Sequence, residues 1–390
     1  VFLRPLGLRL PLHASERTEL TPLVIAGGTA MFNCEPIADF IDIAEIGEGE
    51  EMNAELIELH RRARREGWTK QQFLRAAAQI GGVYVPSLYD VDYNADGTVK
   101  SITPKDGAPK VVTKRIMRDM DKAWYPAKTI VPSTEIVQDR TTLELFRGCI
   151  RGCRFCQAGY VYRPVRNRSR DLCADYCVRA CDDTGYQEVT LSSLSTSDYP
   201  PLTTLCDELE PFCDQRHVSL SLPSLRADNF SMGLMEKLRQ GGRKSGLTFA
   251  PEAGSQRLRD AINKNVTEED LLTSCARAFS GGWNNVKLYF MLGLPTETEE
   301  DMKGIPLLSE TIARRYYEEV PKEKRHGKVN ITASASFFVP KPFTPFQWAT
   351  MFPKEEYLRR AYLVKDTFAE QLNHKAMHFQ YHEADVTVLE

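Results

Sequence analysis

The stretch ELFRGCIRGCRFCQAGYVY, residues 144–162, holds three cysteines, Cys149, Cys153 and Cys156, in the spacing C-x3-C-x2-C. Four thiolates complete a tetrahedral zinc site or saturate an iron–sulfur cube, whereas three thiolates leave one metal position open. Glycines permit the tight turns that such a loop needs, and this one contains Gly148, Gly152 and Gly159. The stretch therefore predicts an iron–sulfur site with one open iron.

Two other interpretations of the loop stay open. In the first, the three cysteines form part of a zinc site. No Cys or His follows Cys156 within the next sixteen residues to complete such a site at the spacing of a zinc finger. A disulfide is the other interpretation, although the sequence shows no secretory segment and its cysteines are not arranged as the framework of a small domain.

The segment resembles the signature of the radical S-adenosylmethionine (SAM) enzymes, in which an aromatic residue, here Phe155, precedes the last cysteine. The resemblance implies a [4Fe-4S] cluster on Cys149, Cys153 and Cys156, with SAM bound at the open iron. It also implies reductive cleavage of SAM to a 5′-deoxyadenosyl radical, with an electron donor such as flavodoxin or ferredoxin. The catalytic residues and the substrate stay unknown.

Composition describes an ordinary globular chain of 390 residues, with 42% hydrophobic and 26% charged residues. Its net charge of −3 gives no indication of nucleic-acid binding. We find no uncharged apolar stretch of membrane-spanning length and expect a cytoplasmic protein without membrane contact. The chain starts at Val1 rather than at an initiator methionine, and we expect it to be a fragment.

From residue 141 onward, apolar strands alternate with helical stretches, which favours a parallel sheet with right-handed crossovers. The strands are expected at residues 143–146, 188–194, 218–222, 247–249, 286–292 and 330–338. The predicted fold class is α/β, and the resemblance makes this region a partial (β/α)6 barrel with the cysteine loop after its first strand. Active sites of such barrels lie at the carboxyl ends of the strands.

The region before the barrel reads as strand, helix, strand and helix over residues 22–65, part of a doubly wound α/β unit. It resembles the end of the cobalamin-binding-like domain fused to one uncharacterised branch of radical SAM enzymes. Cobalamin is a possible cofactor of that family, but the Asp-x-His-x-x-Gly motif is absent here and His13 does not lie in one. The predicted domains are 1–65 (end of the cobalamin-binding-like domain), 66–140 (hairpin linker), 141–372 (radical SAM core) and 373–390 (start of a further segment).

Turns after the later strands supply further candidate contacts for the cofactor. The resemblance implies that Ser193 and Ser195 bind the amino group of SAM, that Glu252 accepts the ribose hydroxyls, and that Gly293 lets the backbone approach adenine. Arg226 is a candidate for a carboxylate. The serines equally fit a helix-capping turn, Glu252 fits a first helical turn, and Thr296 is expected to cap the next helix.

Several other features carry weaker predictions. Cys173, Cys177 and Cys181 recur every fourth residue, which favours a buried helical stripe over a second cluster. Gln138 and Phe343 stand where many relatives have histidine. Eight arginines surround the loop and fit either an anionic ligand or a solvated rim, namely Arg140, Arg147, Arg151, Arg154, Arg163, Arg166, Arg168 and Arg170.

Two rival functions stay open. One is a tRNA-modifying methylthiotransferase-like enzyme, which normally carries additional cluster cysteines and a small RNA-binding barrel. The other is a non-catalytic iron–sulfur protein that acts as a sensor or an assembly partner. A spectroscopic response of the cluster to SAM separates the sensor from the enzymes.

Overall fold

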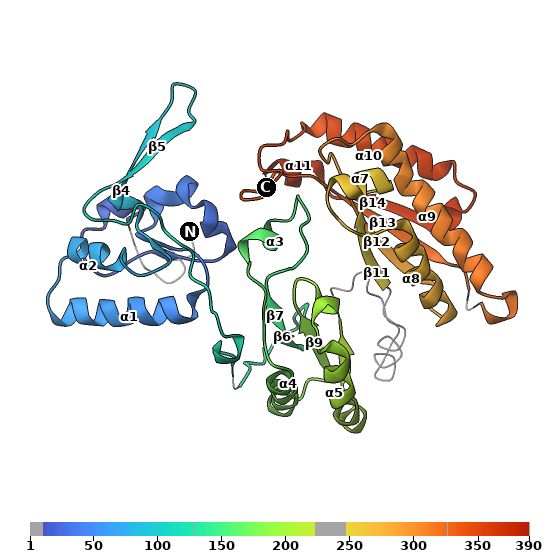
Figure 1. Cartoon of the computed structure of the whole chain (residues 1–390), viewed down its shortest axis with the longest axis horizontal. Helices are drawn as coiled ribbons and strands as arrows, with labels where there is room; N and C mark the ends of the chain where they lie inside the picture. The colour runs from blue at the N-terminus through green and yellow to red at the C-terminus, as the bar shows by residue number, and fades with distance from the viewer. Residues whose placement is uncertain (1–10, 127, 223–246, 326, 390) are drawn as a thin grey trace. The chain divides into compact units, whose positions relative to one another are not determined.

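The computed structural model describes residues 11–126, 128–222, 247–325 and 327–389. The chain divides into two compact units, residues 1–125 and residues 126–390, which are treated separately below (Figure 1). The domain limits at residues 65, 140 and 372 stay predictions.

The first unit is built on a three-stranded sheet with the order β1-β2-β3, in which β1 and β2 are parallel and β3 is antiparallel. Its strands and α-helices are β1 (Ile25–Ala26), β2 (Ile43–Glu45), α1 (Gly49–Arg65), α2 (Lys70–Ala77) and β3 (Val83–Tyr84). The strands and the helix predicted for residues 22–65 are confirmed, and the short helix between the two strands is a 3-10 helix, Glu35–Phe40.

Both helices of the first unit carry end signals that explain their limits. Acidic residues in the first turn of α1 and arginines in its last turn complement the helix dipole. The side chain of Thr69 caps α2 in a reciprocal arrangement with Gln72. The helices bury Met52 and Phe73 in one core together with Ile43.

A hairpin follows the sheet, as predicted, and consists of β4 (Tyr89–Tyr93) and β5 (Val99–Pro104). Its turn is the predicted Asn94–Gly97 segment, in which the Gly97 N–H donates to the Asn94 carbonyl at 3.0 Å. Gly97 has a φ of +82°, a conformation that glycine adopts without steric cost.

The second unit contains two parallel sheets with the strand orders β10-β9-β6 and β11-β12-β13-β14. Its strands are β6 (Thr141–Glu144), β7 (Phe146–Arg147), β8 (Arg166–Asn167), β9 (Glu188–Ser192), β10 (Ser219–Ser221), β11 (Leu247–Glu252), β12 (Asn285–Leu292), β13 (Asn330–Phe337) and β14 (Met377–Tyr381). All six predicted strands are present. A further strand, β14, which the sequence pattern does not predict, extends the second sheet parallel to β13.

The first predicted strand is shifted relative to the prediction. β6 begins at Thr141 and ends at Glu144, while Phe146 belongs to β7, which pairs antiparallel with β8. The α-helices of this unit are α3 (Gln157–Val161), α4 (Arg170–Thr184), α5 (Leu202–Arg216), α7 (Gln256–Ala261), α8 (Glu268–Ser280), α9 (Glu299–Glu319), α10 (Lys354–Ala369) and α11 (Ala384–Leu389).

Side chains of β12 alternate between the two faces of its sheet. Val286, Leu288, Phe290 and Leu292 are buried, and they share one core with residues of α8, α9 and α10. Figure 1 shows these three helices along the same side of the sheet. Met291 has the opposite parity and packs instead with residues of the loops that follow the strands. The face opposite the helices therefore borders the candidate site.

Candidate cofactor site

The cysteine loop leaves the short strand β7 through Gly148, which has a φ of +87°. A Cβ atom on Gly148 would lie 2.7 Å from the Pro164 carbonyl oxygen, so this position requires glycine. Cys153 is buried, while Cys149 and Cys156 are partly exposed. Cys156 directly precedes α3, so the three thiols lie between a strand end and a helix start.

Backbone N–H groups point at two of the three sulfurs. The Arg151 N–H donates to Cys149 Sγ at 3.4 Å. Burial raises the pKa of the Cys156 thiol, and a hydrogen bond from the Gly159 backbone acts in the opposite direction. Such donors stabilise the thiolate form, which is the form that binds iron, and hydrogen bonds to sulfur tune iron–sulfur clusters.

Within the described ranges, no three His, Cys, Asp or Glu side chains converge closely enough to bind a single metal ion. A cubane makes a different demand, because each thiolate binds a different iron at a separate corner. Three cysteine thiols of one short loop, with backbone donors to their sulfurs, fit such a cluster in donor chemistry.

The end of α7 and the loop that follows it, residues 262–265, dock on the cysteine loop. The Asn263 side chain donates to the Gly152 carbonyl at 2.8 Å, and the Arg154 N–H donates to the Ile262 carbonyl at 2.9 Å. The Arg154 guanidinium adds a bond of 2.6 Å to the Ala261 carbonyl. This loop is not among the predicted site segments. Its Asn-Lys-Asn sequence is a local signal for left-handed turns, and both asparagines adopt that conformation.

Glu252 is the last residue of β11 and has a φ of +68°, unusual for a residue with a side chain. Its carboxylate accepts a hydrogen bond from Lys264 Nζ at 3.0 Å. The alternative that Glu252 opens a helix is wrong, because α7 begins at Gln256 and is capped by Ser255. The carboxylate lies in a strand-end turn beside the cysteine loop.

The serine turn after β9 connects to the cysteine loop through an ion pair. The Ser195 hydroxyl donates to Asp198 at 2.6 Å, and Asp198 accepts the guanidinium of Arg151. Ser193 Oγ lies 3.0 Å from Thr196 Oγ1. Both hydroxyls are thus engaged within their own turn, and Ser195 helps to orient an arginine of the cysteine loop.

The turn after β12 is held closed by a buried carboxylate. The Gly293 N–H donates to Glu297 at 2.8 Å, and Arg360 on α10 donates to the same carboxylate at 2.6 Å. Burial raises the pKa of Glu297 to about 7, while the Gly293 N–H and Arg360 oppose that rise. The capping prediction for Thr296 is wrong: Thr298 caps α9, because its side chain rather than that of Thr296 reaches the first helical N–H groups.

Phe155 packs against a small apolar cluster that includes Ala253, Leu294 and Phe338, which follow β11, β12 and β13. This contact brings the cysteine loop together with the turns that carry Glu252 and Gly293. Arg226, the remaining candidate, lies outside the described residues.

Several arginines near the loop have partners within the protein. Arg147 pairs with Glu144, and Arg151 pairs with Asp198. Arg166 and Arg168 are buried and donate to backbone carbonyls of Pro164, Tyr162 and Glu144. These four arginines therefore stabilise the loop through contacts within the protein.

The cysteines of α4 form a buried stripe, which confirms the packing interpretation. Cys173 and Cys177 are 0% and 1% exposed, and Cys181 is also buried. Helix α4 packs against α5, which contributes the buried Cys206. These thiols therefore belong to the core between two helices.

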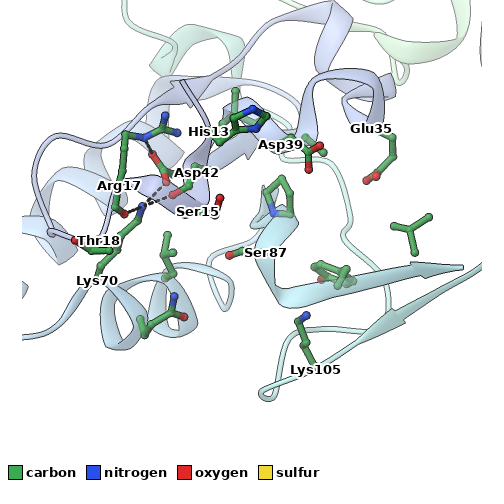
Figure 2. A pocket seen from close by; sticks show the side chains of 18 of the residues that line it. His13, Ser15, Arg17, Thr18, Glu35, Asp39, Asp42, Lys70, Ser87 and Lys105 are labelled. Atoms are coloured by element: carbon green, nitrogen blue, oxygen red, sulfur yellow. Dashed lines mark hydrogen bonds and ion pairs between the residues drawn. The ribbon is translucent and has the colours of Figure 1, made fainter. Parts of the chain in front are cut away.

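The first unit has a cavity of about 800 Å³ bordered by the segment from His13 to Thr18. At one side of it, Figure 2 shows Arg17 and Lys70 converging on Asp42, with distances of 3.1 Å and 2.6 Å. Lys70 also donates to the Ala14 carbonyl at 3.2 Å, and all three charged side chains are buried. This ion cluster ties residues 14–17 to β2 and α2, which is a structural role.

Comparison with known proteins agrees with this architecture. Residues 6–86 match the family model described as radical SAM proteins, N-terminal, and residues 143–305 match the radical SAM superfamily model. The second match begins within β6 and includes the cysteine loop and the turns after β9, β11 and β12. The chain belongs to the radical SAM superfamily.

One curated relative and two solved structures illustrate the relationship. The uncharacterized protein MJ0966 of Methanocaldococcus jannaschii is 31% identical over 327 residues, which are 83% of this chain and 61% of that protein. The radical SAM methyltransferase TsrM of Kitasatospora setae, solved with cobalamin and a [4Fe-4S] cluster, aligns with a TM-score of 0.50 at 15% identity, over 84% of this chain and 57% of TsrM. OxsB, a cobalamin-dependent SAM radical enzyme, aligns with a TM-score of 0.48 at 13% identity, over 88% of this chain and 43% of OxsB.

The chain thus spans about three fifths of the length of its curated relative. Likeness to TsrM supports the partial-barrel fold. In the part of the chain that the structure describes, none of the helices combines the length and the hydrophobicity that a membrane crossing needs.

Proposed function

We propose that this chain binds a [4Fe-4S] cluster through Cys149, Cys153 and Cys156 and uses it to cleave SAM reductively. When bound and reduced, the cluster supplies the electron that breaks a carbon–sulfur bond of SAM and yields a 5′-deoxyadenosyl radical. The observation that carries the proposal is the three-cysteine loop after the first barrel strand, with backbone N–H groups directed at its sulfurs.

The roles of the chain's own residues follow from their positions. The three thiolates bind iron, and Phe155 fixes the loop against the turns that follow the other strands. In this proposal Glu252 accepts hydroxyl groups of the ribose, and the proposal is supported by the acceptor sites that its carboxylate keeps when one oxygen is engaged by Lys264. Ser193, Ser195 and Gly293 supply backbone groups around the same site, and Arg226 stays a candidate for a carboxylate.

The test is anaerobic reconstitution with iron and sulfide, followed by dithionite and SAM. We expect release of methionine and 5′-deoxyadenosine in equal amounts, measured by chromatography and mass spectrometry. A protein with full cluster content that releases neither product refutes the proposal. Cys156→Ala should abolish both products, whereas Cys177→Ala, which alters a buried thiol of α4, should retain them.

The same preparation distinguishes the sensor alternative. If SAM binds the open iron, its addition changes the electron paramagnetic resonance spectrum of the reduced cluster, whereas a sensor without a SAM site gives an unchanged spectrum. Cobalamin, which the TsrM structure holds, stays outside this proposal because a likeness at 15% identity supports the fold alone. A flavodoxin or ferredoxin donor and the cytoplasmic location stay predictions, and no substrate is proposed.

A further inference from the structure

Lys264 lies at the centre of the turn that docks on the cysteine loop. Asn263 and Asn265 on either side of it have φ angles of +55° and +54°, in the left-handed region that asparagine adopts more readily than most other residues with a side chain. The Lys264 N–H also donates to the Arg259 carbonyl at 2.9 Å. The backbone on both sides of Lys264 is therefore held in a defined turn.

The ammonium group of Lys264 is withdrawn from water. The residue is 9% exposed, and its Nζ atom lies 3.0 Å from Glu252 Oε1. Glu252 is itself held in a left-handed conformation at the end of β11. Because a buried charge without a partner is strongly unfavourable, the two residues depend on each other.

This ion pair joins the end of β11 to the turn that docks on the cysteine loop. The Ile262 carbonyl of that turn accepts a hydrogen bond at 2.9 Å from the Arg154 N–H, which lies between the ligands Cys153 and Cys156. Asn263 ties the same turn to Gly152, three residues after Cys149. Screening by salt is weak for such partly buried charges.

We propose that Lys264 and Glu252 are positioning residues that set the reduction potential of the cluster bound by the cysteine loop. Reduction adds one electron, supplied by the donor, and makes the cluster more negative. The Lys264 ammonium stabilises that state, and the Glu252 carboxylate destabilises it, since net charge near a cluster is one determinant of its potential. This inference rests on the proposed function only in its requirement for a bound cluster.

The test is an anaerobic redox titration of the reconstituted full chain, followed by electron paramagnetic resonance in the absence of SAM. We expect Lys264→Met to lower the potential and Glu252→Gln to raise it, while Lys264→Arg stays near the wild-type value. The expected size is about a tenfold change in the ratio of reduced to oxidised cluster at a fixed potential, equivalent to about 59 mV for one electron. Lys303→Met, which removes an exposed lysine of α9, is the matched control and should leave the potential unchanged.

Shifts of opposite sign in the two variants support the inference. Shifts of the same sign, or no shift at full cluster content, overturn it. If Lys264→Met fails to assemble a cluster, Glu252→Gln decides alone, because an unchanged or lowered potential in that variant overturns the inference. Because the titration contains no SAM, a wild-type protein that fails to cleave SAM refutes the proposed function and leaves this result standing.

Discussion

The second unit contains two groups of three cysteines whose surroundings differ, one in a loop and one on the buried face of a helix. Cys149, Cys153 and Cys156 lie in a loop at a strand end, where backbone N–H groups point at sulfur. The three cysteines of α4 recur every fourth residue, so they lie on one face of the helix and face the core. The hydrogen bond with Cys181, together with burial, holds the pKa of Cys177 above its usual value. Spacing and backbone geometry, rather than the number of cysteines, thus distinguish a ligand set from packing.

The largest effect is expected from removing one cysteine of each group. Cys153→Ala should reduce the iron and sulfide content of the reconstituted protein severely and abolish SAM cleavage, because two thiolates hold a cubane poorly. Cys177→Ala should retain both properties, since its thiol contacts the core and not the loop. Iron and sulfide analysis of the two variants, prepared in parallel, checks this prediction.

If the Cys177→Ala protein folds but loses its iron, the α4 cysteines contribute to the metal site, and their assignment to core packing is wrong. Circular dichroism of both variants before reconstitution shows whether each has kept its secondary structure.

The next largest difference is expected in the stability of two glycine variants, one in the turn beside the cysteine loop and one at the end of α4. A Cβ atom on Gly254, in the turn after β11, would lie 2.5 Å from the Gly304 carbonyl carbon and 2.6 Å from the Asp301 carbonyl oxygen. Gly185, which ends α4 with a φ of +73°, has nothing within 4 Å of that position. Gly254→Ala should therefore destabilise the second unit by about 3 kcal/mol or more, and Gly185→Ala by about 1 kcal/mol.

Urea titration of both glycine variants, followed by circular dichroism, measures the difference. Equal effects would indicate that the turn after β11 can move away from α9, and that the site is less rigid than its contacts imply.

The sequence predicts the strands of the barrel because each is a short apolar run between helical stretches. Six of the eight residues of β12, for example, are hydrophobic, and they stand out from the polar segment that follows. β14 was missed because its sequence, Met-His-Phe-Gln-Tyr, carries only three apolar residues and gains its stability by pairing with β13. Pairing between strands distant in the chain leaves little local signal.

The candidate site was predictable to the extent that its residues form a local motif. The cysteine loop is one continuous segment, so its spacing is visible in the sequence. Lys264 lies more than a hundred residues after the cysteine loop in the sequence. The fold brings it into contact with Glu252 and close to that loop. Thr296 and Thr298 both fit a helix cap by type, and the difference between them is backbone conformation, since Thr296 has a φ of +68°.

Asn263 allows the docking of the two loops to be tested. Its side chain bonds to the Gly152 carbonyl, and its backbone is left-handed. Asn263→Ala loses the bond and strains the backbone, whereas Asn263→Gly loses only the bond. We expect destabilisation of about 2 kcal/mol for alanine and about 1 kcal/mol for glycine.

The rate at which a chelator removes iron from reconstituted protein reports on this docking directly. Both Asn263 variants should lose iron faster than wild type, and alanine faster than glycine. If both retain iron at the wild-type rate, the contact between the loops does not stabilise the cysteine loop.

The smallest expected effect concerns the environment of the stripe itself. Cys177→Ala should lower the stability of the second unit by about 1 kcal/mol, because it removes one buried sulfur atom from a packed core. Cys177→Ser preserves the size of the side chain but buries a hydroxyl whose partner is the Cys181 thiol, a weak hydrogen-bonding group, and a poorly satisfied buried hydroxyl costs about 1–3 kcal/mol. Serine should therefore be the less stable of the two in urea titration, with the iron content of both unchanged. Should serine prove as stable as cysteine, the stripe would be polar rather than apolar, and the contrast with the cysteine loop would have to rest on backbone geometry alone.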